Sequence, residues 1–171
     1  MQLSLKENST KKEIFEQVEQ YLTENGFKIE LQDQTRPWGG FFVIDEEQSN
    51  LFIESFLNDI PEAKSKNVGK ISPKILVVQP QKRLSWQYHH RRSEVWKVIA
   101  GEAGVVTSDT DDENPVRTIE LNDVVVLKKG QRHRLIGTDG WGIIAEIWQH
   151  TDPANPSNEE DIVRVTDDFG R

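Results

Sequence analysis

A series of short apolar runs, each followed by a turn signal, restricts the fold of this chain more than any other feature. From residue 41 onward each run is too short for a typical helix, and residues such as Pro73, Pro80, Gly101 and Gly130 separate them. Many short strands at this spacing are typical of a β-sandwich or barrel. The strands we predict span residues 41–44, 51–56, 75–78, 95–99, 104–107, 124–127, 132–136, 143–148 and 161–165.

One amphipathic helix is predicted before these strands, over residues 10 to 25. Thr10 and Glu13 have the spacing of a capping box, and Gly26 is placed to end the helix. We expect the apolar face of this helix to pack across a sheet or against a partner subunit. It is not expected to carry chemistry.

The length of 171 residues suits one domain with a substantial core. We expect a helical extension over residues 1–34 and a single β domain over residues 35–171. No apolar run approaches the roughly 20 residues that cross a bilayer, and no basic stretch leads into an apolar one at the N-terminus. A cytoplasmic protein without membrane contact is therefore expected.

The formal net charge of −8 disfavours nucleic acid as a partner, because phosphate backbones are bound by dense positive surfaces. The chain has no cysteine, so any metal must be held by nitrogen and oxygen donors. The positive residues nevertheless gather near residues 82–97 and around His133, which suits a small anion. This cluster consists of Lys82, Arg83, Arg91, Arg92, Lys97, Arg132 and Arg134.

Four side chains in two segments form a candidate metal site. Gln87 and His89 alternate along a predicted strand and so project to one face, and Glu94 joins them if a bend intervenes. His133 would come from a separate strand. Two imidazoles, a carboxylate and an amide oxygen suit Zn²⁺, Mn²⁺, Fe²⁺, Co²⁺ or Ni²⁺, with zinc the first expectation and an open position for substrate.

The spacing of these residues resembles the two motifs of the cupin superfamily. The first is Gln87-x-His89-x4-Glu94-x6-Gly101, with glutamine in place of the usual first histidine, and the second is Gly130-x2-His133. The flanking segments narrow the resemblance to the cupin domain of type II mannose-6-phosphate isomerases. Those segments are Arg36-Pro37-Trp38-Gly39, Ser85 to Trp96, Gly130 to Leu135, Glu146 to Gln149, Glu160 to Arg164 and Asp168 to Arg171.

This resemblance implies a double-stranded β-helix, the cupin jelly roll, and a metal-dependent isomerase. The implied reaction converts mannose 6-phosphate to fructose 6-phosphate. Similar stand-alone chains are described as phosphoheptose isomerases, so a seven-carbon sugar is also open. Arg91 and Val95 stand where the family often has histidine, which bears on the identity of the sugar more than on metal binding.

Isomerisation needs a base and a clamp for the phosphate. Glu146, in an otherwise apolar strand, and Lys74, after Pro73, are the candidate bases, whereas strand alternation points His90 away from the metal. Arg91 shares the parity of Gln87 and His89, so it is the candidate phosphate clamp. The family resemblance adds Arg164 and Arg171 as further phosphate-binding residues.

Two other interpretations are compatible with this sequence. A regulatory cupin that binds a metal or a sugar without turnover is the alternative from a different class. An iron oxygenase or another cupin lyase is disfavoured, because glutamine replaces the first histidine and the arginines favour an anionic sugar. Cupin chains commonly pair, so we expect a homodimer, with the N-terminal helix as one available surface.

Overall fold

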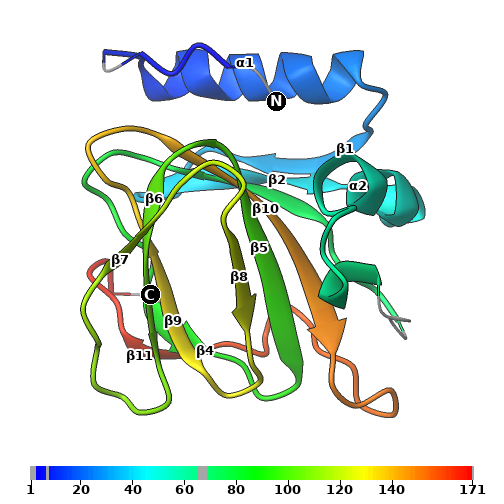
Figure 1. Cartoon of the computed structure of the whole chain (residues 1–171), viewed down its shortest axis with the longest axis vertical. Coiled ribbons are helices and arrows are strands. Elements are labelled where there is room, and N and C mark those ends of the chain that lie inside the picture. The colour runs from blue at the N-terminus through cyan, green and yellow to red at the C-terminus, as the bar shows by residue number, and fades with distance from the viewer. Residues whose placement is uncertain (1–2, 7, 65–68, 171) are drawn as a thin grey trace.

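The chain folds into two antiparallel β-sheets with helices on the outside, as seen in a computed structural model that describes residues 3–6, 8–64 and 69–170 (Figure 1). Within these residues, the larger sheet has the spatial order β1 (Ile29–Asp33), β2 (Gly39–Ile44), β3 (Lys74–Val78), β10 (Gly142–His150), β5 (Arg92–Gly101) and β8 (Val124–Leu127). The smaller sheet has the order β11 (Val163–Thr166), β4 (Trp86–Tyr88), β9 (Arg132–Ile136), β6 (Ala103–Ser108) and β7 (Arg117–Ile119). The predicted all-β class is confirmed.

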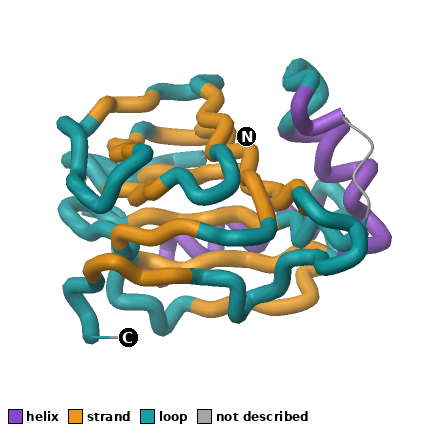
Figure 2. Tube along the Cα trace, turned by 90° about the horizontal axis from the view of Figure 1, so that it is seen from below, coloured by secondary structure: helices purple, strands orange, loops and turns teal. Residues whose placement is uncertain are grey.

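The two sheets enclose an apolar core, and a second core lies between the larger sheet and the helices. In the view from below, the strands surround the interior while the helices lie outside them (Figure 2). Strands β3, β5 and β10 contribute to both cores, which explains why their sequences are nearly continuous apolar runs. The inner core contains Leu76, Val78, Trp96, Val98, Ala103, Val105, Ile119, Val125, Leu127, Leu135 and Ile144.

Helix α1 (Lys11–Glu24) lies across the outer face of the larger sheet (Figure 1). The predicted capping box is present, since Thr10 and Glu13 bond to each other's backbone, and Gly26 adopts a positive φ of 79° after the helix. The buried side chains of α1 share a core with β2, and the Phe15 ring stacks on Phe42 at 5.2 Å. The helix therefore packs on the chain's own sheet.

One strand prediction is wrong. Residues 51–56 belong to helix α2 (Ser49–Phe56), which follows the short 3-10 helix η1 (Glu46–Gln48); a second 3-10 turn, η2 (Glu62–Lys64), comes later. Phe52 and Phe56 are spaced one helical turn apart, and both pack against Phe27. Such a short apolar run is compatible both with the 3.6-residue period of a helix and with the two-residue period of a strand. Among the described residues, neither α1 nor α2 is long and apolar enough to span a bilayer.

A bend and a tight turn fix the position of β5. Residues 89–91 form the bend between β4 and β5, which belong to different sheets. At the other end, Gly101 adopts a φ of 68°, and a Cβ there would lie 1.9 Å from the carbonyl oxygen of Trp141. Only glycine fits this turn. Strand β5 is thereby held between β10 and β8 with Glu94 near its start.

Candidate metal centre

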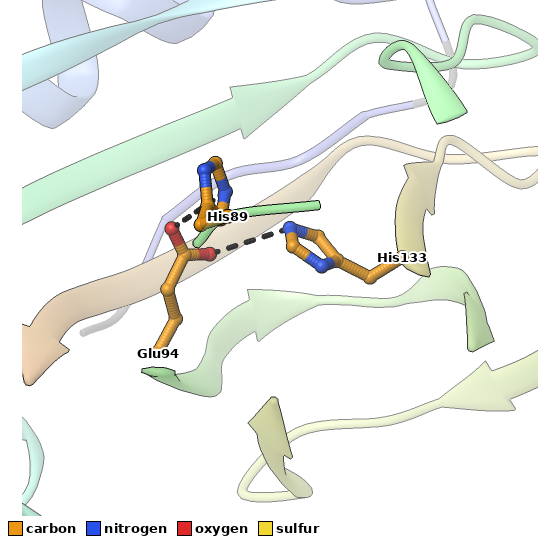
Figure 3. Close-up of side chains that lie close together, drawn as sticks. All are labelled: His89, Glu94 and His133. Atoms are coloured by element: carbon orange, nitrogen blue, oxygen red, sulfur yellow. Dashed lines mark ion pairs between the residues drawn. The ribbon is translucent and has the colours of Figure 1, made fainter. Parts of the chain in front are cut away.

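Three predicted ligands converge between the two sheets (Figure 3). His89 comes from the bend after β4, Glu94 from β5 and His133 from β9, and all three are buried. Glu94 lies between the imidazoles, with Oε1 at 3.2 Å from Nε2 of His89 and Oε2 at 3.6 Å from Nε2 of His133. Their donor atoms lie within 4.8 Å of one another, as ligands of one ion must.

Backbone carbonyls orient both imidazoles. The Nδ1 atom of His89 lies 2.5 Å from the carbonyl oxygen of Asp161, and that of His133 lies 3.0 Å from the carbonyl oxygen of Gln131. A neutral imidazole that donates from Nδ1 keeps the lone pair of Nε2 free for a metal. Both Nε2 atoms face Glu94, so the tautomers that these contacts favour are those that metal binding requires.

The protonation states suit a cation as well. Burial is the main reason that the pKa of His133 falls to about 4, which keeps its imidazole neutral. Burial alone would raise the pKa of Glu94, but His89, Arg92 and His133 outweigh it and hold that pKa well below its usual value. The centre therefore combines an ionised carboxylate with at least one neutral imidazole at neutral pH.

Two buried ligand atoms without hydrogen-bond partners support the fit of a metal to these residues. Among the described residues, Oε2 of Glu94 and Nε2 of His133 are buried without a hydrogen-bond partner, which is costly unless another group satisfies them. Two imidazoles and a carboxylate are ligands typical of a divalent transition metal with an open position. Gln87 pairs with His133 across β4 and β9, and its Oε1 accepts a hydrogen bond of 2.6 Å from Ser85. Its role as a fourth ligand stays a prediction.

The guanidinium of Arg92 also reaches this centre. Its Nε donates to Oε1 of Glu94 at 2.8 Å, and its Nη2 lies 3.3 Å from Nε2 of His89. Arg92 stacks on the ring of Trp148, with 3.8 Å between its Cζ and the ring centroid. A positive charge is thus already placed against two of the three ligands.

A pocket of about 150 Å³ opens onto the centre. Glu94, Arg92 and Gln87 line it together with residues from the smaller sheet, β3 and the segment before β2. Its remaining lining residues are Arg36, Trp38, Phe41, Lys74, Leu76, Leu84, Ser85, Trp96, Glu146, Glu159, Ile162 and Arg164. The larger hollow beside α2, about 670 Å³, contains none of the predicted site residues.

Both candidate bases lie on this pocket, in register with each other on β10 and β3. Burial, with a contribution from Glu94, raises the pKa of Glu146 to about 7, although Lys74 and Arg92 oppose the shift. Trp148 donates from Nε1 to Glu146 at 3.3 Å. Lys74 forms an ion pair of 2.7 Å with Glu159.

Of the predicted phosphate-binding residues, only Arg164 lines the pocket, and Arg171 lies outside the described residues. The orientation expected for Arg91 is wrong. Its guanidinium donates to Asn155, Asn158 and the carbonyl oxygen of Pro156, away from the pocket. The alternation of a strand does not continue through the bend at residues 89–91, so the parity argument fails there.

Sequence reasoning also missed contacts that hold the centre. Sequence alone places Arg92 only in the positive cluster suited to a small anion, although it lies two residues before Glu94 on one strand and so shares its face. The carboxylate of Asp161 accepts from the backbone N–H groups of His90 and Arg91 at 3.0 Å each, and from Ser157 at 2.7 Å. No local pattern signals the Asp161 contacts, because their partners in the bend lie about 70 residues away.

Curated relatives of this chain are longer proteins. It is 28% identical to the xanthan biosynthesis protein XanB of Xanthomonas campestris pv. campestris (strain B100), over 80% of this chain and 23% of that protein. It is 33% identical to the mannose-1-phosphate guanylyltransferase of Escherichia coli (strain K12), over 57% of this chain and 19% of that protein. The chain thus spans less than a quarter of either relative.

Solved structures support the fold. A mutant of Bacillus subtilis oxalate decarboxylase OxdC superposes with a TM-score of 0.54, at 12% identity over 78% of this chain and 30% of that one. The capsular polysaccharide assembling protein CapF from Staphylococcus aureus gives 0.52, at 14% identity over 90% and 36%. At these identities the likeness shows the fold alone, and it confirms the cupin jelly roll.

The sequence also matches a family profile, which is described as the C-terminal part of mannose-6-phosphate isomerase. The match covers residues 60–167, more than half of the chain, and includes the bend, β5, β9 and the Asp161 segment. This chain therefore belongs to the mannose-6-phosphate isomerase C-terminal domain family, as its motifs predicted.

Proposed function

We propose that this domain interconverts an aldose phosphate and a ketose phosphate, with mannose 6-phosphate and fructose 6-phosphate as the first pair. The observation that carries the proposal is the position of Glu146, a buried acid with a pKa of about 7, on the same pocket as Glu94. Family membership and the guanylyltransferase relative support a sugar phosphate as the ligand.

The reaction moves one proton between neighbouring carbons. The base removes a proton from the hydroxyl-bearing carbon next to the carbonyl and returns it to the former carbonyl carbon. The proton of that hydroxyl passes to the former carbonyl oxygen, so the carbonyl and hydroxyl groups exchange places. A divalent cation held by His89, Glu94 and His133, zinc in our proposal, would supply Lewis acid chemistry that stabilises the developing negative charge. Gln87 is proposed as its fourth ligand.

We assign the proton transfer to Glu146. A carboxylate with a pKa near 7 accepts a proton readily and still returns it, which suits a base that must do both. Lys74 was the other candidate, but its ammonium is engaged by Glu159 and lies 4.4 Å from the centroid of the Trp148 ring. It is better placed to bind a negative charge.

The proposal is tested by metal analysis of the purified protein followed by coupled isomerase assays on hexose and heptose phosphates. We expect about one transition metal per chain and turnover of at least one phosphosugar. Removal of the metal with a chelator should abolish turnover, and its return should restore it. A fully loaded protein that turns over no sugar phosphate would contradict the proposal.

The contacts of Arg92 favour a second candidate function. Because its guanidinium lies against His89 and Glu94, it neutralises the carboxylate in the way that a metal would. A domain that uses this internal cation would bind a sugar phosphate without converting it. Sugar-phosphate binding by protein that contains no metal and shows no turnover would support this regulatory module.

A further inference from the structure

Four positively charged residues line the pocket: Arg36, Lys74, Arg92 and Arg164. Two of these charges are committed to neighbours. Arg36 lies 2.8 Å from a carboxylate oxygen of Asp33, and Arg92 donates to Glu94. Arg164, which is exposed, makes no ion pair within residues 3–6, 8–64 and 69–170. Lys74 differs from all three, because its partner is an acid at the surface.

The ammonium of Lys74 is fixed without help from that acid. Its backbone pairs with β2 and β10, and the side chain is only 9% exposed. The Nζ atom lies 4.4 Å from the centroid of the Trp148 ring and 5.8 Å from that of Phe41. Aromatic faces attract a cation and hold it in place. The charge of Lys74 is therefore preorganised on the pocket wall.

Of the two side chains in this ion pair, that of Glu159 is the easier to displace. Its side chain is 72% exposed, and it comes from the connection between β10 and β11. Water can solvate this carboxylate as soon as it leaves Lys74, so its release costs little. The buried ammonium, in contrast, would keep only Glu146 as a neighbouring carboxylate among the described residues that line the pocket, so it favours a further anion on the pocket side.

We propose that Lys74, together with Arg164 on the lining of the same pocket, is the receptor for the phosphate group of the substrate, and that Glu159 occupies this receptor until the substrate displaces it. The inference rests on the proposed function for the identity of the ligand, a phosphate monoester. A dianion on the pocket side would satisfy Lys74 more fully than one exposed carboxylate. Glu159 would then exclude neutral sugars and weak monoanions from the same position.

Binding of inorganic phosphate at pH 8, measured by calorimetry on the protein as purified, tests this receptor without any need for turnover. Because E159Q removes the competitor, we expect phosphate to bind about three- to fivefold more tightly. E160Q is the matched control: it removes the same charge from the next, exposed residue, which does not line the pocket. Its affinity should equal that of the wild type.

A double-mutant cycle ties the effect to Lys74. K74Q should weaken phosphate binding about tenfold or more, and E159Q should have no effect in the K74Q background. Phosphate bound at the metal centre alone would be insensitive to both changes. Equal shifts for E159Q and E160Q, or an E159Q effect that persists in K74Q, would overturn the proposal. The comparison of E159Q with E160Q involves only exposed positions, so it stands even if K74Q does not fold.

The outcomes separate this inference from the isomerase proposal. Phosphate binding that responds to E159Q in a protein without isomerase activity would sustain the receptor and contradict the isomerase. Turnover of a phosphosugar by E159Q, with its KM and the affinity for inorganic phosphate both unchanged from wild type, would support the isomerase and contradict the receptor.

Discussion

At the scale of single residues, His133 illustrates how burial prepares a ligand. The residue is 1% exposed, its Nδ1 faces a carbonyl oxygen, and its Nε2 has no hydrogen-bond partner among the described residues. Burial lowers its pKa to about 4, so the neutral form that binds metals is present at any pH well above that value. The buried Nε2 atom would be satisfied by a bound cation.

We expect His133→Ala to lose the metal while the fold is kept. The loss of a direct ligand should reduce metal affinity by more than the roughly 10- to 100-fold that loss of an outer partner costs. Elemental analysis after dialysis measures the metal, and circular dichroism checks the fold. His90→Ala is the control, because His90 is exposed and contacts Tyr88 instead. Full metal occupancy in His133→Ala would refute the assignment of this ligand.

Glu146 should give the protein a pH dependence of its own. Its folded pKa of about 7 lies above the ordinary value of 4.5, so between these values the folded state holds a proton that the unfolded chain has lost. The stability that Glu146 contributes is therefore present at low pH and is lost as the pH rises through about 7. Activity should follow the opposite trend, because the base works only when it is ionised.

Glu146→Gln is expected to remove both trends. In metal-free protein, the variant should gain about 1–3 kcal/mol of unfolding free energy relative to wild type between pH 5 and pH 8. Urea titrations at the two pH values measure this, with exposed Glu120→Gln as the control. If kcat/KM of the variant fell by less than about tenfold, Glu146 would not be the base.

Residue spacing predicted that three candidate ligands lie close together. His89, Glu94 and His133 come together as the spacing of the two motifs predicted, and their binding of a metal stays a prediction. Arg91 points elsewhere than expected, because strand alternation does not continue through the bend at residues 89–91. Within β5 alone, the same rule would have selected Arg92.

At the scale of elements, the segment that contains Ser157 and Asp161 supports the bend from outside the two sheets. Asp161 holds the backbone of His90 and Arg91 with its carboxylate and the ring of His89 with its carbonyl oxygen. Ser157 and the carbonyl oxygen of Asn158 accept from Arg92 at 3.0 Å each. The geometry of the metal centre thus depends on residues near the end of the chain.

Asp161→Ala should weaken both the fold and the metal centre. Two backbone N–H groups would lose their acceptors, at a cost of about 2–4 kcal/mol in unfolding free energy, and metal affinity should fall about 10- to 100-fold. Denaturant unfolding and metal titration measure the two effects. Asp152→Ala serves as the control in the same connection, since Asp152 is exposed and caps only Ala154. Unchanged metal affinity would show that the bend holds its shape alone.

Helix α1 should contribute strongly to stability through its apolar face. Phe15 is fully buried against Phe42, so Phe15→Ala should lower the unfolding free energy by about 3–5 kcal/mol. The exposed position Glu19 on the same helix, changed to alanine, should have almost no effect. Urea unfolding compares the two. A loss below about 1 kcal/mol for Phe15→Ala would mean that the helix is only loosely attached.

Elements with strong local signals were predicted, and elements that depend on tertiary contacts were not. The capping box and Gly26 predicted a helix over residues 10 to 25, and α1 spans Lys11–Glu24. The apolar run of residues 51–56 is too short to distinguish helical from strand periodicity, so the sequence predicts a strand where helix α2 lies. Its helical form becomes favourable only when Phe52 and Phe56 meet Phe27, far away in the sequence.

At the scale of the whole molecule, the layers determine which surfaces are free for a partner. The apolar face of α1 covers the chain's own sheet, so the helix does not offer that face to a second subunit. We still predict a homodimer, and light scattering after size-exclusion chromatography should give twice the chain mass of 19.7 kDa. A mass of one chain at micromolar concentration would contradict it.

Two of the five tryptophans in this chain contact charged or ligand side chains of the site. The ring of Trp148 lies under the charges of Lys74 and Arg92, and that of Trp96 meets His133 edge-on at 5.5 Å. The emission of an indole responds to nearby charge, and both rings stand where charge changes when an ion or an anion arrives. The unlabelled protein thus carries an optical reporter of its own occupancy, readable by fluorescence during a titration.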